Sequence, residues 1–151
     1  MIPLKNLNYI SKKLPISSID CIIKLNNKFL LIKRNRWPAK NKYTFPGSII
    51  QKNVSIKLSI KRLLKRELNI NFTSNPKLLG VEKFFFLKDF YGKKNKIEYV
   101  SHLYLIKLKK NEIKNIILDN DHLKFIFLNK NEINRNKNVI GQIKKFIKNN
   151  F

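Results

Sequence analysis

Hydrophobic and polar positions in the first third of the chain follow the pattern of two short strands. Residues 19–25 and 28–34 are rich in Ile, Leu and Phe, and Asn26-Asn27 lies between them. Asparagine tolerates the positive φ that a two-residue hairpin turn requires. The two runs therefore predict a β-hairpin, and Tyr43-Thr44-Phe45 predicts a further short strand that Pro46-Gly47 ends.

Residues 55–68 have the period of an amphipathic helix. Apolar side chains recur there at spacings of three and four, and three lysines fall on the opposite side. Asn53 or Ser55 can cap the first turn, and Asn69 stands where helices commonly end in a left-handed residue. We expect one helix with a buried face and a solvated face.

The remaining pattern completes an α/β (α+β) fold. Residues 78–87 and 98–108 predict two long strands, residues 125–128 predict another, and residues 138–150 predict a closing amphipathic helix. Strand pairs interrupted by a helix indicate a mixed β-sheet sandwiched between helices. The polar stretches at 5–13 and 129–138 are expected to be peripheral.

Length and composition favour a single domain over residues 1–151. No apolar run approaches the roughly 20 residues that span a bilayer, and Met1 to Leu14 lacks a signal-peptide pattern. The single cysteine, Cys21, excludes an internal disulfide and a cysteine-based zinc cluster, and is expected to be a small buried strand residue. These features predict a cytoplasmic protein with no membrane segment.

The net charge of +24 admits two interpretations. A strongly basic chain suggests a nucleic acid or another polyanion as partner. However, Lys, Asn and Ile together fill 71 of the 151 positions, and the lysines are spread over the whole length. Because these residues have AT-rich codons, compositional bias in an AT-rich genome explains the charge without selection for a polyanion.

One stretch has the spacing of a known sequence motif. Residues 47–70 resemble in frame the Nudix box, G-x5-E-x7-R-E-U-x-E-E-x-G-U, where U is apolar. The matching positions are Arg62, Leu64, Glu67 and Ile70, and the departures are Ser48, Val54, Leu63, Arg66 and Asn69.

Further stretches extend the resemblance to one Nudix subfamily, the GDP-mannose mannosyl hydrolases, over about residues 14–128. They occur in the order seen in that subfamily, which has itself lost a box carboxylate at the position of Leu63. The stretches are Leu14-Pro15, 18–20, 29–34, Pro38-Ala39, 45–47, Gln51-Lys52, Gly80-Val81, Ser101-His102 and Asp121-His122.

This resemblance implies hydrolysis of GDP-mannose or GDP-glucose to GDP and free sugar. Water would attack the anomeric carbon of the sugar, and the diphosphate would leave with its charge neutralised by arginines and by Mg²⁺ (or Mn²⁺). The subfamily is commonly dimeric, so a homodimer is possible, although no interface can be read from the sequence.

The resemblance also assigns the metal ligands position by position. Glu67 is the retained helix carboxylate, and carbonyl oxygens near Gly47 and Ser48 would supplement it. Asp121 stands where the subfamily has a glutamine ligand and keeps an oxygen donor suited to Mg²⁺. His122 matches the general base, for which a pKa near neutrality is suitable.

The substrate contacts come from other segments. Arg34 would hold the diphosphate, and Asp20 would face the same region from its place in the hairpin. Trp37 is a candidate for stacking on the base, and His102 falls in one of the matching stretches as a candidate substrate contact.

Several observations favour other interpretations. Without the resemblance, His122 would be a surface histidine, Glu67 a partner of a neighbouring lysine, and His102 a packed strand residue. Ile49 and Val54 stand where the subfamily has an arginine and a glutamate, so impaired activity is expected. A catalytically inactive Nudix fold that binds RNA, or a Nudix enzyme for another pyrophosphate, are the alternatives.

Overall fold

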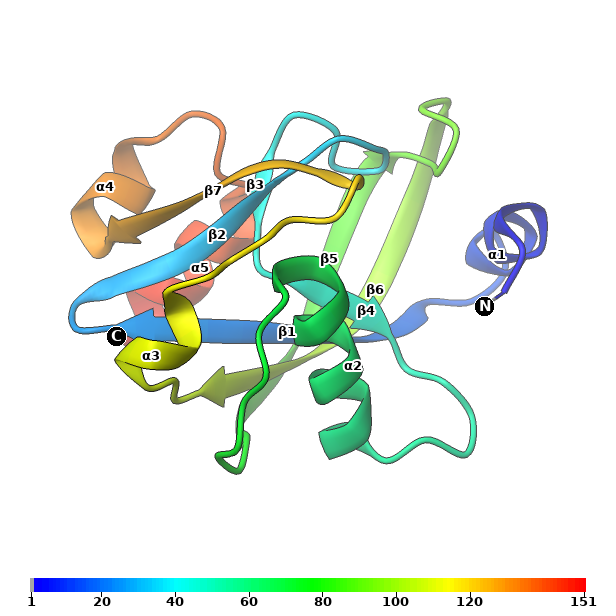
Figure 1. The fold of residues 1–151 in the computed structure, drawn as a ribbon. Coiled ribbons are helices and arrows are strands. Elements are labelled where there is room, and N and C mark those ends of the chain that lie inside the picture. The colour runs from blue at the N-terminus through cyan, green and yellow to red at the C-terminus, as the bar shows by residue number, and fades with distance from the viewer. Residues whose placement is uncertain (1) are drawn as a thin grey trace.

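Seven strands form one mixed sheet, and helices lie against it on both sides (Figure 1). This arrangement comes from a computed structural model that describes residues 2–151. It confirms the predicted fold class. The strands are β1 (Ile16–Leu25), β2 (Lys28–Arg34), β3 (Tyr43–Thr44), β4 (Gly47–Ile49), β5 (Lys77–Lys88), β6 (Lys94–Ile106) and β7 (His122–Asn129). The helices are α1 (Leu4–Ser11), α2 (Ile56–Leu68), α3 (Lys110–Ile113), α4 (Lys130–Arg135) and α5 (Gly141–Asn150).

Strand β1 is the centre of the sheet. It runs parallel to β6 and antiparallel to β4, and its last two residues pair with the start of β2. Strand β2 in turn pairs with β3 and β7, and β6 pairs with β5. The middle of β1 is therefore enclosed by β4 and β6, which is where Asp20 lies opposite Gly47.

The predicted hairpin is confirmed as β1 and β2. Asn26 adopts a φ of 53°, which is the left-handed conformation expected of the turn. Strand β1 begins three residues earlier than the pattern indicated, at Ile16, and Pro46-Gly47 does not end strand structure, because β4 begins at Gly47.

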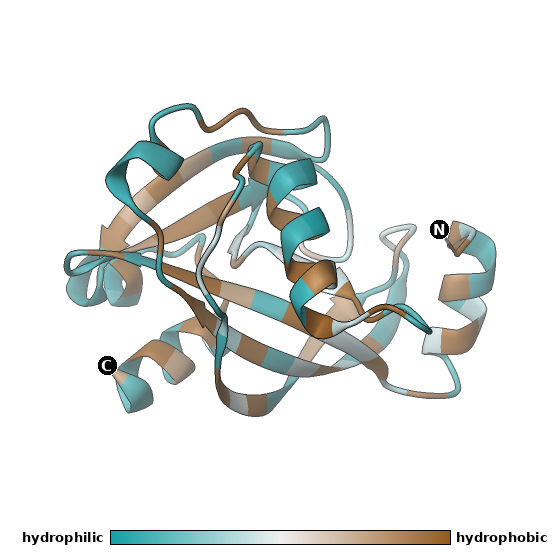
Figure 2. Cartoon of the chain, turned by 60° about the horizontal axis from the view of Figure 1, so that its bottom comes forward, coloured by the Kyte–Doolittle hydropathy of each residue, from teal (hydrophilic) through white to brown (hydrophobic). Residues whose placement is uncertain are grey.

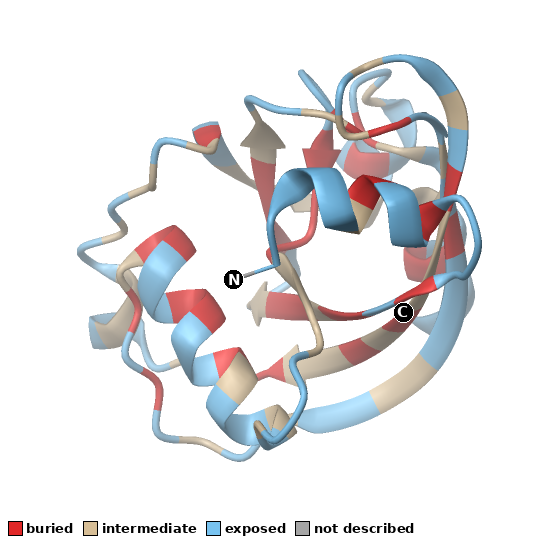
Figure 3. Ribbon diagram, turned by 90° about the vertical axis from the view of Figure 1, so that its right-hand side faces the viewer, coloured by how far each residue is buried: buried red, intermediate tan, exposed pale blue. Residues whose placement is uncertain are grey.

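Helix α2 follows the amphipathic pattern closely. The Ser55 hydroxyl accepts a hydrogen bond from the Leu58 amide at 3.3 Å, and Asn69 ends the helix with a φ of 56°. Apolar and polar residues alternate along the helix in Figure 2, and Figure 3 shows buried residues on one side of it only. The buried side includes Ile60, Leu63, Leu64 and Leu68, packed against Ile19, Cys21 and Ile23 of β1.

A second core lies on the other side of the sheet. Ile143, Phe146 and Ile147 of α5 pack there with residues from β2 and β6, such as Leu31 and Leu103. Because β1 supplies side chains to both cores, its residues alternate between them. The closing helix is confirmed, and it begins at Gly141.

Helices α1, α3 and α4 and strand β4 were not predicted, and β7 begins earlier than predicted. Helix α1 buries Asn8 and Ser11 instead of an apolar stripe, so the hydrophobic period does not reveal it. Helix α4 begins at a capping box in which Asn129 and Glu132 exchange hydrogen bonds. Strand β7 begins at His122, three residues before the predicted strand, so His122 belongs to a strand and not to a loop.

Two expectations from composition can be compared with the structure. Cys21 is a free, buried cysteine in β1, as predicted. Across residues 2–151, no helix is both long enough and apolar enough to cross a membrane.

Candidate active site

The ends of β2 and β7 bring Arg34 and His122 together. These residues are direct partners in the antiparallel register of the two strands, next to a β-bulge. The Asn35 amide donates to the Asp121 carbonyl at 2.8 Å and ties the two chain segments together beyond the strands. The Arg34 Nε atom is buried and has no hydrogen-bond partner, so this donor is free to receive an acidic group.

His122 lies between two carboxylates. Its Nδ1 atom is 2.6 Å from Asp119 Oδ1, and its Nε2 atom is 4.0 Å from Glu67 Oε2. Only 3% of the His122 side chain is exposed, which contradicts the alternative of a surface histidine. Burial lowers the pKa of His122, against the opposing effect of Asp119, so the imidazole is neutral at physiological pH.

Glu67 is a buried carboxylate with one free oxygen. Oε1 accepts from Arg66 at 3.0 Å, whereas Oε2 is buried and has no partner. Glu67 is 6% exposed, so it is not a surface residue paired with a lysine. Burial raises the pKa of Glu67 to about 7, although the hydrogen bond from Arg66 lowers it.

Asp20 forms a second buried acidic position. Its Oδ2 accepts from the Ser101 hydroxyl on the neighbouring strand β6 and, at 3.5 Å, from Ser18. Burial raises the pKa of Asp20 to about 6, while the Ser101 hydrogen bond and Arg34 lower it. A Cβ atom on Gly47 would lie 2.5 Å from Asp20 Oδ1, so only glycine fits beside this carboxylate.

The charge of Arg34 acts on all three titratable groups. It lowers the pKa of Asp20, of Glu67 and of His122. Of the residues that were predicted to act together, Glu67 and His122 are in contact and Arg34 is the strand partner of His122, whereas the side-chain partners of Asp20 are Ser18 and Ser101. This arrangement can receive a group with negative charge, such as a phosphate, beside a neutral base.

Two other predicted metal ligands, Asp121 and Ser48, form contacts with neighbouring protein groups. The Asp121 carboxylate pairs with Arg36 Nη2 at 2.7 Å and is partly exposed. Ser48 lies in β4, and its hydroxyl donates weakly to the Ile49 carbonyl at 3.5 Å. Metal binding by Asp121 and by the carbonyls of Gly47 and Ser48 stays a prediction.

Trp37 lies against the turn between β5 and β6. Lys88 Nζ is 4.3 Å from the centroid of its ring, and a Cβ atom on Gly92 would clash with Trp37 Nε1. The ring is thus already in contact with a cation on one side. Stacking of Trp37 on a base stays a prediction.

His102 is in β6, next to Ser101. Because side chains alternate along a strand, His102 lies on the opposite face from Ser101, the residue that contacts Asp20. The His102 Nδ1 atom is 3.0 Å from the Ser18 carbonyl. This is the cross-strand position that the alternative interpretation expected, and a substrate contact by His102 stays a prediction.

The carboxylates near His122 can be compared with the ligands that a divalent cation requires. Among residues 2–151, no three His, Cys, Asp or Glu side chains gather into a cluster that could hold a metal. Mg²⁺, however, is usually bound through one or two carboxylates, with water and substrate phosphates as the other ligands. The unpartnered Glu67 Oε2 fits the part of a single protein carboxylate in such a site.

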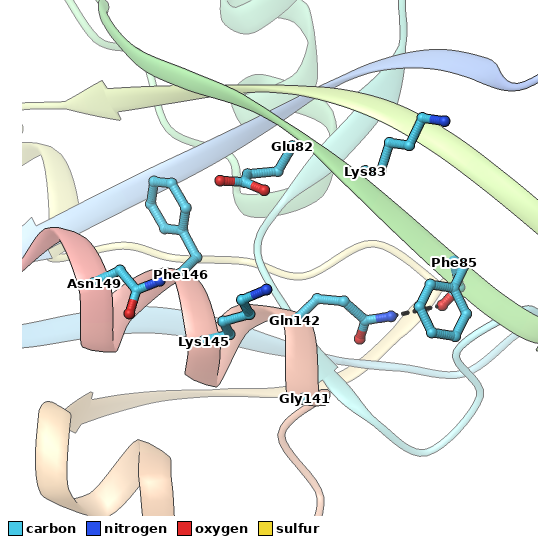
Figure 4. Close-up of a pocket in the computed structure, with 8 residues that line it drawn as sticks. All are labelled: Glu82, Lys83, Phe85, Gly141, Gln142, Lys145, Phe146 and Asn149. Carbon is cyan, nitrogen blue, oxygen red and sulfur yellow. Dashed lines mark hydrogen bonds between the residues drawn. The ribbon is translucent and has the colours of Figure 1, made fainter.

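A groove elsewhere on the surface contains none of these residues. It lies between β5 and α5, has a volume of about 450 Å³, and is crossed by a hydrogen bond of 2.8 Å from Gln142 Nε2 to the Phe85 carbonyl (Figure 4). Its lining mixes Glu82 and Lys145 with aromatic rings and has no buried titratable group. None of the candidate site residues from the sequence therefore lines this groove.

Sequence reasoning missed three residues of the site. Asp119 contacts His122, Ser101 contacts Asp20, and Arg36 contacts Asp121. The Asp119-x-x-His122 spacing was the available signal, because a turn brings residues three apart within hydrogen-bond reach. The partner of Asp20 depends on the parallel pairing of β1 with β6, for which the sequence holds no direct signal.

Comparison with known proteins identifies the class of protein. The model of the NUDIX domain family matches residues 15–149, and the chain belongs to that family. No curated protein matches the chain. The likeness to GDP-mannose mannosyl hydrolases is not shown by any of these comparisons.

Solved structures have the same fold at low sequence identity. A MutT protein from Methanosarcina mazei Go1 is 17% identical with a TM-score of 0.72, over 91% of this chain and 94% of that one. A C. elegans Ap4A hydrolase binary complex is 14% identical with a TM-score of 0.61, over 88% and 93% of the two chains. A bifunctional NMN adenylyltransferase/ADP ribose pyrophosphatase from Francisella tularensis, complexed with AMP and a Mn ion, is 19% identical with a TM-score of 0.58. That match covers 89% of this chain and 41% of the other.

Proposed function

We propose that the protein hydrolyses a nucleoside diphosphate linked to a sugar, GDP-mannose or GDP-glucose, and releases GDP and the free sugar. The observation that carries this proposal is the buried, neutral His122, which lies beside the free oxygen of Glu67 and opposite Arg34. A neutral imidazole is a competent base toward water, and the nearby guanidinium favours a diphosphate.

The reaction needs one proton transfer and one bond cleavage. Water attacks the anomeric carbon of the sugar, and His122 Nε2 takes the proton that the water loses. The bond between that carbon and the β-phosphate oxygen breaks, and its electrons leave with GDP. Arg34 stabilises the negative charge that develops on the departing diphosphate. A bound Mg²⁺ or Mn²⁺ would supply additional positive charge there, held by Glu67.

The other predicted residues have supporting parts. Asp20 is fixed by Ser101 and lies within the influence of Arg34, and we propose that it contacts the sugar side of the substrate. Asp121 and the carbonyls of Gly47 and Ser48 would add oxygen ligands to the metal. Trp37 and His102 would contact the nucleotide.

The decisive experiment follows the fate of a solvent oxygen atom. Purified protein is incubated with Mg²⁺ and GDP-mannose in H₂¹⁸O, and the products are analysed by proton NMR and mass spectrometry. The proposal requires GDP and mannose, with ¹⁸O in the sugar. Products GMP and mannose 1-phosphate, with ¹⁸O in a phosphate, would identify a pyrophosphohydrolase of the family instead. The absence of any product would leave the inactive RNA-binding fold as the better interpretation.

Variants connect the product to the site. We expect Glu67→Gln and His122→Gln each to lower kcat by about 100-fold or more, because one removes a metal ligand and the other removes the base. Glu82→Gln is the matched control, since Glu82 is an exposed carboxylate on β5. Retention of full activity by His122→Gln would exclude the proposed base.

A further inference from the structure

We propose that Asp119 is a positioning residue that holds neutral His122 in the tautomer with its hydrogen on Nδ1. This inference rests on the proposed function, because it gives His122 Nε2 the lone pair that the base needs. No box position and none of the matching stretches includes Asp119, and its place is visible only in the folded chain.

The distance between the two groups sets the direction of the hydrogen bond. His122 Nδ1 and Asp119 Oδ1 are 2.6 Å apart, which is a short, charge-assisted contact. A carboxylate oxygen at this distance is an acceptor, so we infer that Nδ1 is the donor and carries the hydrogen. In the neutral ring, Nε2 then has no hydrogen and can accept one from water.

Glu67 competes for the opposite tautomer. A hydrogen on Nε2 would point toward Glu67 Oε2, but that oxygen is 4.0 Å away, beyond hydrogen-bond distance. The same tautomer would place the Nδ1 lone pair against the Asp119 carboxylate. The contact of Nδ1 with Asp119 is the shorter of the two. The hydrogen of the neutral ring is therefore on Nδ1, next to Asp119, and not on Nε2, next to Glu67.

The backbone holds Asp119 in place for this task. Its Oδ1 atom also accepts from the Asp121 amide at 3.1 Å, and the His122 amide donates to the Asp119 carbonyl at 3.3 Å. The carboxylate is thus fixed by the same turn that delivers His122 to β7. With 3% of the His122 side chain exposed, water does not compete for Nδ1.

The first test observes the hydrogen directly. Nitrogen-15 NMR of the full-length, metal-free protein at pH 8 distinguishes the tautomers of a neutral histidine, and a His102→Asn variant assigns the two rings. We expect Nδ1 of His122 to be protonated in the wild type. In Asp119→Asn the amide can donate to Nδ1, so we expect the hydrogen to move to Nε2. In Asp119→Glu, which keeps a carboxylate, we expect Nδ1 to stay protonated.

The second test uses the reaction. Asp119→Asn should lower kcat on GDP-mannose by about 100-fold with KM changed less than about threefold, because the base is lost while the phosphate contacts are kept. Asp119→Glu should recover part of the loss, and Glu82→Gln should behave as the wild type. A merely structural role for Asp119 would change neither the tautomer nor the ratio of the two kinetic effects.

The results separate this inference from the proposed function. A wild-type His122 with its hydrogen on Nε2, or a tautomer unchanged in Asp119→Asn, overturns the positioning role whatever the activity. If the tautomer of His122 changes in Asp119→Asn but the protein does not hydrolyse GDP-mannose, the positioning role is supported and the proposed function is contradicted. If kcat is the same in Asp119→Asn and in the wild type, the tautomer of His122 is not important for catalysis.

Discussion

Burial changes the pKa values of three side chains in this site from their values in water. Burial raises the pKa of Asp20 to about 6 and that of Glu67 to about 7, and it lowers the pKa of His122. Asp20 and Glu67 are therefore partly protonated near neutral pH while the imidazole is neutral. A cation that displaces those protons recovers charged carboxylates inside the protein.

Stability of the metal-free protein should reflect the raised pKa of Glu67. An unfolded Glu67 releases its proton near pH 4.5, whereas the folded one keeps it until about pH 7. Stability is therefore lost as pH rises through that window. We expect Glu67→Gln, which cannot ionise, to be more stable than the wild type by about 3 kcal/mol at pH 8 and equally stable near pH 4. Urea unfolding at both pH values measures this difference.

The control for this prediction is Glu82→Gln, which makes the same change at an exposed carboxylate. Chelator is present throughout, because a bound cation would favour the ionised carboxylate. A Glu67→Gln variant that is less stable than the wild type at pH 8 would show that the Arg66 ion pair outweighs the cost of burial.

At the scale of elements, the hydrophobic pattern predicted the hairpin from two apolar runs around Asn26-Asn27, and it predicted α2 from the single apolar face of that helix. The period fails for α1, where Asn8 and Ser11 are the buried residues, and for β7, whose first residue is His122. It also cannot show which strands pair. The contact of Asp20 with Ser101 depends on β1 lying parallel to β6, so a partner 81 residues away stays hidden in the sequence.

The junction of β1 and β4 gives a second prediction. Gly47→Ala should destabilise the protein by about 1–3 kcal/mol, because the new Cβ atom would lie 2.5 Å from Asp20 Oδ1 and 3.2 Å from the Ile19 carbonyl. Gly80→Ala is the matched control in β5, since no atom lies within 4 Å of its added Cβ. Thermal unfolding of both variants tests this, and equal melting temperatures would contradict it.

The start of α2 gives a third. Ser55→Ala removes the acceptor of the Leu58 amide and should cost about 1 kcal/mol, because that amide is left without a partner inside the helix. Ser55→Asp keeps an acceptor and should retain the stability of the wild type. The two variants differ in denaturation midpoint if the cap stabilises α2, and an unchanged midpoint in Ser55→Ala would refute it.

For the whole molecule, the net charge of +24 surrounds the site for which we propose an anionic substrate. Lysines along the entire chain attract phosphates of any kind, and self-repulsion among them opposes the folded state. The charge would therefore raise the local concentration of the proposed nucleotide substrate without specifying it. In the proposed function, specific recognition depends on the buried groups near Arg34.

Measurements of single-stranded RNA binding distinguish non-specific electrostatic attraction from a specific RNA-binding surface. We expect the affinity of the protein for RNA to fall about tenfold or more between 50 and 200 mM salt. Binding releases counterions from the RNA, and a higher salt concentration makes that release less favourable. Glu67→Gln should bind RNA like the wild type, because Glu67 is buried. Fluorescence anisotropy with a labelled oligonucleotide measures both effects. An affinity that persists at 200 mM salt would instead indicate a nucleic-acid surface on this protein.

Trp37 is the single tryptophan of the chain, and its ring rests on Gly92 under the ammonium group of Lys88. It directly follows Arg36 in the loop after β2. The intrinsic emission of the protein therefore reports on the surroundings of this loop. Titration with GDP would record loop movement in real time, without any attached dye.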